Sequence, residues 1–199
     1  MTGDSTVFVV DDDASVRRSL GRLLGSIGYR VESFPDADSF LAEYDAGRPG
    51  CLLLDIQMPG MNGLALQEEL VRRDLRIPVI VISAYGDVEA TVRAIKTGAV
   101  DFLQKPYKCK VLLTRIREAL EQDRHNRQEE AARARAKARL KSLTPREREV
   151  MEYLVEGQSS KQIAFMLGLS RKTIDIHRAH VMTKLDAESV VDLVHMWAK

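Results

Sequence analysis

The residue with the clearest chemical potential is Asp55, which directly follows the apolar run 51–54. Gly50 precedes this run and Pro59-Gly60 comes soon after it, which predicts a buried central strand of a parallel sheet. A carboxylate at the C-terminal end of such a strand lies where open α/β sheets bind their ligands. Asp55 is therefore the first candidate for chemistry, although Asp also ends strands because it suits turns.

Four further polar side chains follow other predicted strands and should meet Asp55 at one edge of the sheet: Asp11, Asp12, Ser83 and Lys105. Three converging carboxylates repel one another unless a cation neutralises them. An all-oxygen cluster suits Mg²⁺, which keeps several waters and accepts a phosphate oxygen. The Lys105 ammonium and the Ser83 hydroxyl could then stabilise an anion formed on Asp55. This set predicts an aspartyl-phosphate site.

Each of these residues also has a plainer interpretation, because the acidic triplet 11–13 could cap a helix and Lys105 could be a surface charge. A different class of function is also open, since the same carboxylate–Mg²⁺ edge could serve a phosphohydrolase that acts on small substrates. Against that alternative, Gln57 stands two residues after Asp55, where a further acid/base carboxylate would be needed. The C-terminal half also offers no cap or substrate pocket.

The elements that would position this site alternate regularly over the first 120 residues or so. Apolar and β-branched runs predict strands at 6–10, 29–33, 51–54, 79–82 and 100–103. Helical spacing predicts helices at 14–27, 36–44, 63–73, 87–97 and from 107 onward. This alternation predicts an α/β domain, a doubly wound five-stranded parallel sheet with helices on both faces, spanning residues 1–120.

Composition bounds the remaining possibilities. Among the 199 residues, 45% are hydrophobic and 30% charged, which is typical of soluble globular proteins. Cys51 and Cys109 match no metal or disulfide spacing, so a reduced, cytoplasmic compartment is expected. No apolar run approaches membrane-spanning length, and the N-terminus lacks a secretory signal pattern, so no membrane association is expected.

Residues 121–141 are predicted to link two domains. Seven basic and four acidic residues occur here, and no large apolar residue appears between 121 and 139. Two interpretations remain: a flexible charged linker, or a continuation of the preceding helix supported by the i,i+4 pairs Asp123–Arg127 and Glu129–Arg133. The strong helix formers favour the second.

Residues 142–199 predict an all-α domain of four helices. Thr144-Pro145 with Glu147 forms a capping box, and Gly168-Leu169 separates a short helix from a longer one at 171–185. This helix-turn-helix layout places the longer helix in the DNA major groove. Basic residues outnumber the single acidic Asp175 along that helix, although a bundle with a solvated basic face would look similar. His177 and His180 lack a third ligand nearby, which favours a core or phosphate-facing role over metal binding.

The motifs of the first domain closely resemble a bacterial two-component receiver domain, a flavodoxin-like fold. They are VVDD at 9–12, LDIQMPGMNG at 54–63, VISA at 81–84 and DFLQKP at 101–106. The resemblance implies that a sensor histidine kinase phosphorylates Asp55. It implies further that Asp12, Asp55 and the Gln57 carbonyl bind Mg²⁺, while Asp11 holds a metal-bound water. Ser83 and Phe102 would be the switch residues.

Some positions depart from this family or vary within it. Thr is common where this chain has Ser83, and Gln57 and Tyr85 occupy positions that vary and tune dephosphorylation. The family also implies a cis Lys105–Pro106 bond. Members of this family catalyse only their own phosphorylation and dephosphorylation. The resemblance therefore implies that the protein is not an enzyme acting on other substrates.

The second domain resembles the LuxR-type DNA-binding domain, and the two together resemble FixJ/NarL-type response regulators. The motifs are LTPREREV at 143–150, SKQIA at 160–164 and KTIDIH at 172–177. The resemblance implies base and backbone contacts from exposed positions of the third helix: Lys172, Thr173, Asp175, Ile176, Arg178 and Ala179. Lys161 and Arg171 are further candidates for phosphate contact. Some relatives have Lys in place of Asp175, so base preference should differ from theirs.

These patterns together predict a cytoplasmic transcription regulator switched by Mg²⁺-dependent phosphorylation of Asp55. Its expected partners are a sensor histidine kinase, double-stranded DNA and a second copy of the chain, with RNA polymerase as a further candidate. Phosphorylation is expected to pair two receivers through the face formed by the fourth helix, fifth strand and fifth helix. A phosphorylation-independent regulator is the alternative, which the intact set Asp11, Asp12, Asp55, Ser83 and Lys105 disfavours.

Overall fold

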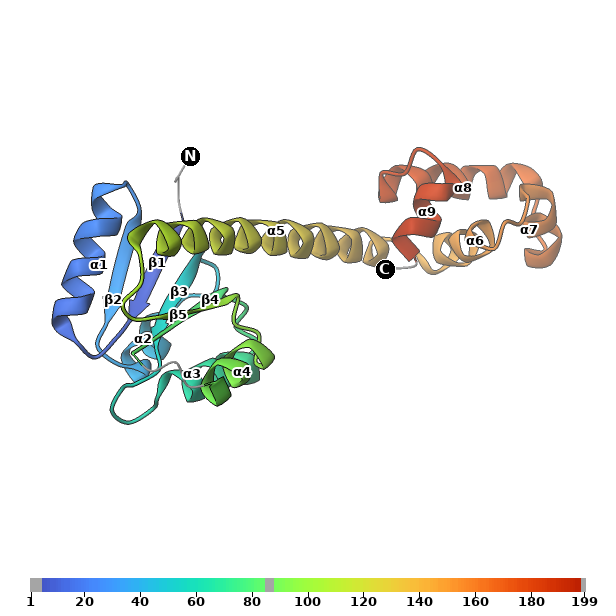
Figure 1. Cartoon of the computed structure of the whole chain (residues 1–199). Helices are drawn as coiled ribbons and strands as arrows, with labels where there is room; N and C mark the ends of the chain where they lie inside the picture. Colours follow the sequence, from blue (N-terminus) through green and yellow to red (C-terminus); the bar gives the residue numbers. More distant parts are fainter. Residues whose placement is uncertain (1–4, 85–87, 198–199) are drawn as a thin grey trace. The chain divides into compact units, whose positions relative to one another are not determined.

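The computed structural model describes residues 5–84 and 88–197, and the first part of the chain forms a parallel five-stranded sheet (Figure 1). The strands are β1 Thr6–Val10, β2 Arg30–Phe34, β3 Gly50–Asp55, β4 Val79–Ser83 and β5 Asp101–Gln104. Their order is β2-β1-β3-β4-β5, which makes β3 the central strand. The strands β2 and β5 lie one residue further along the chain than predicted, because the ladders end at the pairs Val10–Phe34 and Ser83–Gln104.

Helices cover both faces of this sheet. They are α1 Ala14–Ser26, α2 Ala37–Glu43, α3 Gly63–Arg72, α4 Val88–Lys96 and α5 Cys109–Lys141. Side chains alternate along β1, so Val7 and Val9 pack with α1 and α5, while Phe8 and Val10 pack with α2 and α3. The predicted doubly wound α/β sheet is confirmed.

The helix α5 is continuous from Cys109 to Lys141, in agreement with the helical interpretation of residues 121–141. The chain divides into two compact units, Met1–Arg127 and Gln128–Lys199. Beyond residue 120, where the first predicted domain ends, the buried carboxylate of Asp123 accepts a hydrogen bond from the Gly50 amide. The first unit therefore continues to Arg127. Polar contacts hold this part of α5 against the first unit, and such contacts produce no apolar periodicity in the sequence.

The second unit is helical, as predicted. It contains α6 Pro145–Val155, α7 Ser160–Leu167, α8 Arg171–Leu185 and α9 Val190–Trp197. Capping boxes start α6 and α7, and Gly168 ends α7 in the left-handed region (φ 64°), which gives the tight turn into α8. The helices enclose a core that includes Val150, Ile163, Ile174 and Val181. None of the helices within the described part of the chain is long and apolar enough to cross a membrane.

A buried carboxylate joins α6 to α8. Glu147 accepts a 2.6 Å hydrogen bond from the Lys184 ammonium and a 2.8 Å bond from the Thr144 amide. The Lys184 and Thr144 donors hold the pKa of Glu147 at about 2, well below its usual range. Stability from this group is therefore complete above the usual Glu pKa and is lost as the pH falls toward about 2.

Replacing Glu147 with Gln should lower the free energy of unfolding of the second unit by about 1–3 kcal/mol at pH 7, because charged hydrogen bonds are lost. The acid dependence below pH ~5 should also become weaker. Urea titrations followed by fluorescence of the single tryptophan, Trp197, test both effects.

The matched control is Glu149→Gln, which removes an exposed pair with Arg146 and should change stability by less than about 1 kcal/mol. Equal effects of the two substitutions, or an unchanged acid dependence in the Glu147 variant, would show that the buried pair does not stabilise the unit.

Candidate functional site

The C-terminal edge of the sheet gathers four of the predicted site residues. Asp11 follows β1, Asp55 ends β3, Ser83 ends β4 and Lys105 follows β5. Asp11, Asp55 and Ser83 are buried, and Lys105 is partly exposed. The parallel topology explains their convergence, since neighbouring strands all point their C-terminal ends to this edge.

The ammonium group of Lys105 bridges the two buried carboxylates. Its Nζ lies 2.8 Å from Asp55 Oδ1 and 3.0 Å from Asp11 Oδ2. The other carboxylate oxygens accept backbone hydrogen bonds, Asp55 Oδ2 from the Gln57 amide and Asp11 Oδ1 from the Asp13 amide, both at 2.9 Å. Each oxygen of this pair therefore has a donor, as buried carboxylates require.

Burial raises the pKa of the Asp55 carboxyl, and the hydrogen bond from Lys105 opposes that increase without cancelling it. Burial alone would lower the pKa of Lys105, but its hydrogen bonds to Asp55 and Asp11 leave that pKa raised. The arrangement keeps a positive charge in contact with Asp55, in a position to meet any anion attached to this carboxylate.

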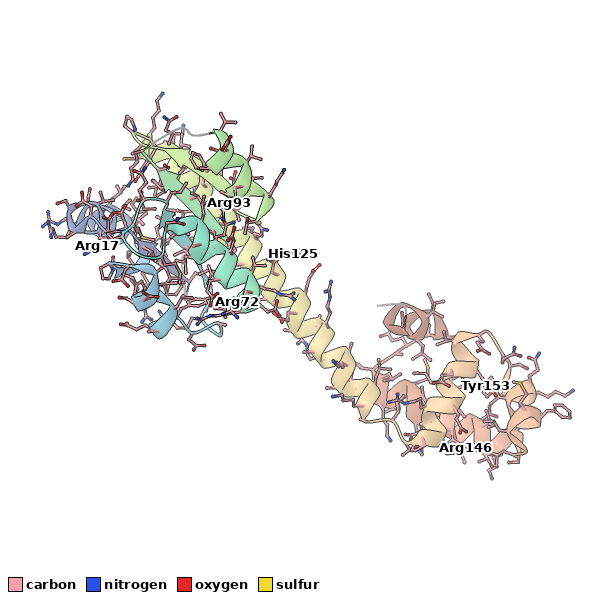
Figure 2. All side chains as sticks on the ribbon, turned by 90° about the horizontal axis from the view of Figure 1, so that it is seen from below. Arg17, Arg72, Arg93, His125, Arg146 and Tyr153 are labelled. Carbon is pink, nitrogen blue, oxygen red and sulfur yellow. The ribbon has the colours of Figure 1, made fainter. Side chains whose placement is uncertain are left out.

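Asp12 follows Asp11 at the end of β1, and its side chain is exposed. Its backbone carbonyl and that of Asp11 accept hydrogen bonds from Arg17 of α1, at 2.9 and 2.6 Å. Figure 2 labels Arg17 on this helix. Arg17 was not predicted to take part in the site, because its only local signal is its position in the first turn of the helix that follows the acidic triplet.

Among the described residues, no three or more Asp, Glu, His or Cys side chains are grouped so that they could hold a metal ion. The donor set still fits Mg²⁺, which typically takes one or two carboxylates and keeps its other positions for water and phosphate. Asp55 and Asp12, with the Gln57 carbonyl, would supply oxygen atoms of this kind.

The turn between β3 and α3 fixes the direction of Asp55. Asn62 caps α3 by accepting from the Ala65 amide, and the Gly63 amide donates to the Ile56 carbonyl at 3.0 Å. A Cβ atom on Gly63 would lie 2.2 Å from the Asp55 carbonyl oxygen. Only glycine therefore permits this close approach of α3 to the end of β3.

The switch candidates lie on the neighbouring strands. The Lys105 amide donates to the Ser83 carbonyl at 2.7 Å, which ties the loop after β5 to the end of β4. Phe102 of β5 is partly buried against the cluster beneath α3 and α4. The Lys105–Pro106 bond is cis, as the family resemblance implied. Tyr85 lies outside the described residues.

In the second unit, the predicted DNA-contact positions are all exposed except Thr173, which is partly buried beside its cap Ser170. Six of these exposed residues lie on α8: Arg171, Lys172, Asp175, Ile176, Arg178 and Ala179. Lys161 is exposed on α7. The Asp175 carboxylate lies 3.8 Å from Arg171, and both side chains are exposed, so this contact contributes little to stability. His180 faces Glu147 at 3.7 Å, and neither it nor His177 belongs to a metal cluster among the described residues.

Comparison with known proteins agrees with this arrangement. Residues 7–117 match the response regulator receiver domain, and residues 141–197 match the bacterial regulatory proteins of the LuxR family. The chain therefore belongs to the response regulators that join a receiver domain to a LuxR-type DNA-binding domain.

Individual relatives extend over nearly the whole chain. Nodulation protein W of Bradyrhizobium diazoefficiens is 44% identical over 190 residues, covering 96% of this chain and 84% of the relative. The transcriptional regulatory protein FixJ of the same species is 40% identical over 196 residues, covering 98% and 96%. A solved structure of the response regulator StyR is 42% identical, with a TM-score of 0.91 and coverage of 98% and 99%.

Substituting Gly63 by Ala should destabilise the receiver by about 1–3 kcal/mol, because the added methyl group overlaps the Asp55 carbonyl. It should also slow chemical modification of Asp55, whose position depends on this turn. Urea unfolding followed by circular dichroism gives the first quantity, and intact mass after treatment with a small-molecule phosphodonor gives the second.

Gly21→Ala serves as the control, since nothing lies within 4 Å of its added Cβ in α1. That substitution should stabilise the helix by up to about 1 kcal/mol. A Gly63 variant as stable and as reactive as the wild type would contradict the role assigned to the turn.

Proposed function

We propose that the protein is a transcription regulator in which Asp55 accepts a phosphoryl group from a sensor histidine kinase. The contact between the buried Asp55 carboxylate and the Lys105 ammonium, at 2.8 Å, carries this proposal. In this reaction a new bond forms between an Asp55 oxygen and phosphorus, while the bond from phosphorus to the kinase histidine nitrogen breaks. The nitrogen keeps the electron pair.

The chain's own groups stabilise the phosphoryl oxygens in this scheme. Lys105 holds its ammonium where the new anion forms, and the Ser83 side chain stands at the end of the adjacent strand β4. Mg²⁺, held by Asp12, Asp55 and the Gln57 carbonyl, with Asp11 on one of its waters, would neutralise charge on the transferred group. Self-phosphorylation and self-dephosphorylation are the only reactions proposed.

We infer dimerisation of the phosphorylated receiver from an apolar face on α4. Val88, Val92 and Ile95 follow helical spacing and are 73%, 45% and 46% exposed. Val111 of α5 is also exposed, and the Asp101–Arg115 pair lies between β5 and α5. An exposed apolar stripe next to charged residues is typical of a protein interface. Phe102 lies on the intervening strand, which connects this face to the site.

In the second unit, α8 is proposed to enter the major groove, with Lys161 of α7 near phosphate. The sequence from residue 142 onward carries equal numbers of acidic and basic residues, so one domain makes a weak electrostatic contact. Two domains on one two-fold site double that contribution. Phosphorylation then acts by changing the dimer population, which requires only a difference in affinity between two receiver states.

Sedimentation of wild type and Asp55→Ala with Mg²⁺, with and without beryllofluoride, tests the switch. Only the wild type should shift toward dimer, and only the wild type should gain a phosphoryl adduct when a phosphodonor replaces beryllofluoride. Val92→Asp is the companion variant, which should take the adduct and remain monomeric because a charge replaces part of the apolar face. Absence of any adduct in the wild type would overturn the proposal.

DNA selection from a random pool, followed by binding at several salt concentrations, tests the interface. Lys161→Gln should weaken binding similarly on all sequences and reduce the salt slope by about 1, as loss of one phosphate contact does. Asp175→Lys should instead alter the selected bases. If neither substitution changes binding, another surface contacts DNA.

A further inference from the structure

The last turn of α5 that belongs to the receiver contains a carboxylate in an unusual environment. Asp123 is 2% exposed, although the stretch around it is highly charged. Its Oδ2 accepts a 2.9 Å hydrogen bond from the amide of Gly50, the first residue of β3. The two residues are 73 positions apart in sequence, so this bond joins distant segments.

Arg127 completes this contact from one turn further along α5. Its Nε donates to both oxygens of Asp123, at 3.0 and 2.9 Å. Its other nitrogens donate to backbone carbonyls before β3, Gly47 at 3.2 Å and Arg48 at 2.6 Å. The guanidinium group thereby neutralises the buried carboxylate and binds the 47–48 loop at the same time.

The 47–48 loop is itself attached to the neighbouring strands. The Arg48 guanidinium pairs with Glu32 of β2, donates to Thr6 of β1 and lies 5.2 Å from the centre of the Phe8 ring. The helix α5 is therefore fixed directly to the start of β3 and, through the 47–48 loop, to the start of β1 and the middle of β2. The edge at the start of β3 is opposite the one that holds Asp55, and β3 spans the distance from Gly50 to Asp55.

Other ion pairs of α5 differ clearly from this one. In the pairs Glu121–Arg124 and Glu129–Arg133 both side chains are exposed. The charged atoms of the second pair are 3.8 Å apart, which is longer than a hydrogen bond. Such pairs contribute little to stability. A buried carboxylate is different, because removing its partner leaves an uncompensated charge away from water.

We propose that Asp123 and Arg127 are positioning residues that anchor the output helix to the sheet and thereby couple the receiver to the DNA-binding unit. This inference rests on the proposed function. The helix starts four residues after Lys105, next to the phosphorylation edge, and the anchor fixes it again at the opposite edge. Residues 109–127 therefore follow the sheet, and residues 128–141 continue the same helix into the second unit.

The test compares Asp123→Asn and Arg127→Gln with the matched controls Glu129→Gln and Arg133→Gln, which remove the exposed pair on the same helix. All are made in the full chain. Three quantities are measured: the beryllofluoride-induced change in affinity for a duplex selected by the wild type, adduct formation at Asp55, and amide hydrogen exchange over residues 120–130.

The anchor variants should still gain the adduct, because the acidic edge is untouched. Their amides at 120–130 should exchange faster. Their affinity ratio with and without beryllofluoride should fall toward 1, whereas coupling in switch proteins is typically about 5–150-fold. The controls should keep the wild-type ratio and exchange rates. Arg127→Lys should recover part of the response, since an ammonium restores the charge without the fork of donors.

Anchor variants that keep the full affinity response while taking the adduct would overturn this inference and leave the proposed function standing. Anchor variants that lose the adduct together with the response would also overturn it, because the effect would then lie in the fold of the receiver. A wild type that shows no response to beryllofluoride would defeat the proposed function first, and the coupling role with it.

Discussion

Two carboxylates buried against one ammonium group constrain the whole receiver. Asp11 and Asp55 are buried at the end of adjacent central strands, and separating them from Lys105 would leave uncompensated charges in a poorly solvated place. The loop after β5 must therefore approach β1 and β3, although β5 is an edge strand. The bond from the Lys105 amide to the Ser83 carbonyl holds that loop in place.

This arrangement also suits the proposed phosphorylation of Asp55. The Lys105 ammonium is shared by two carboxylates and remains partly exposed, so it can turn to a new anion without losing all its partners. A phosphoryl group on Asp55 would add negative charge at the position where the shared cation already lies. In the proposed function, this local change of charge would act on the ends of β4 and β5, where Ser83 and Lys105 are located.

The sequence predicted the sheet and most of the site because both depend on local patterns. Buried parallel strands are continuous apolar runs, and the residues after them must meet at one edge, so Asp11, Asp55, Ser83 and Lys105 could be grouped. The exposed side chain of Asp12 could not be predicted, since it depends on the path of the loop that Arg17 holds through the carbonyls of residues 11 and 12. Asp123 was assigned to the helical linker, and its pair with Arg127 was predicted, but its burial was not, because its partner Gly50 is distant in sequence.

Buried carboxylates form ionic contacts at three junctions between segments, at Glu147, Asp123 and Asp55. The partners of each carboxylate determine whether its junction is fixed or can change. Glu147 and Asp123 each accept from a backbone amide as well as from one cation, and that cation also binds a backbone carbonyl nearby. Such contacts hold two segments in one arrangement. Asp55 instead shares its cation with Asp11 at an open edge, so a second arrangement of that cation costs less. The fold thus combines static ionic junctions, which fix α5 to the sheet and α6 to α8, with one exchangeable junction at the phosphorylation edge.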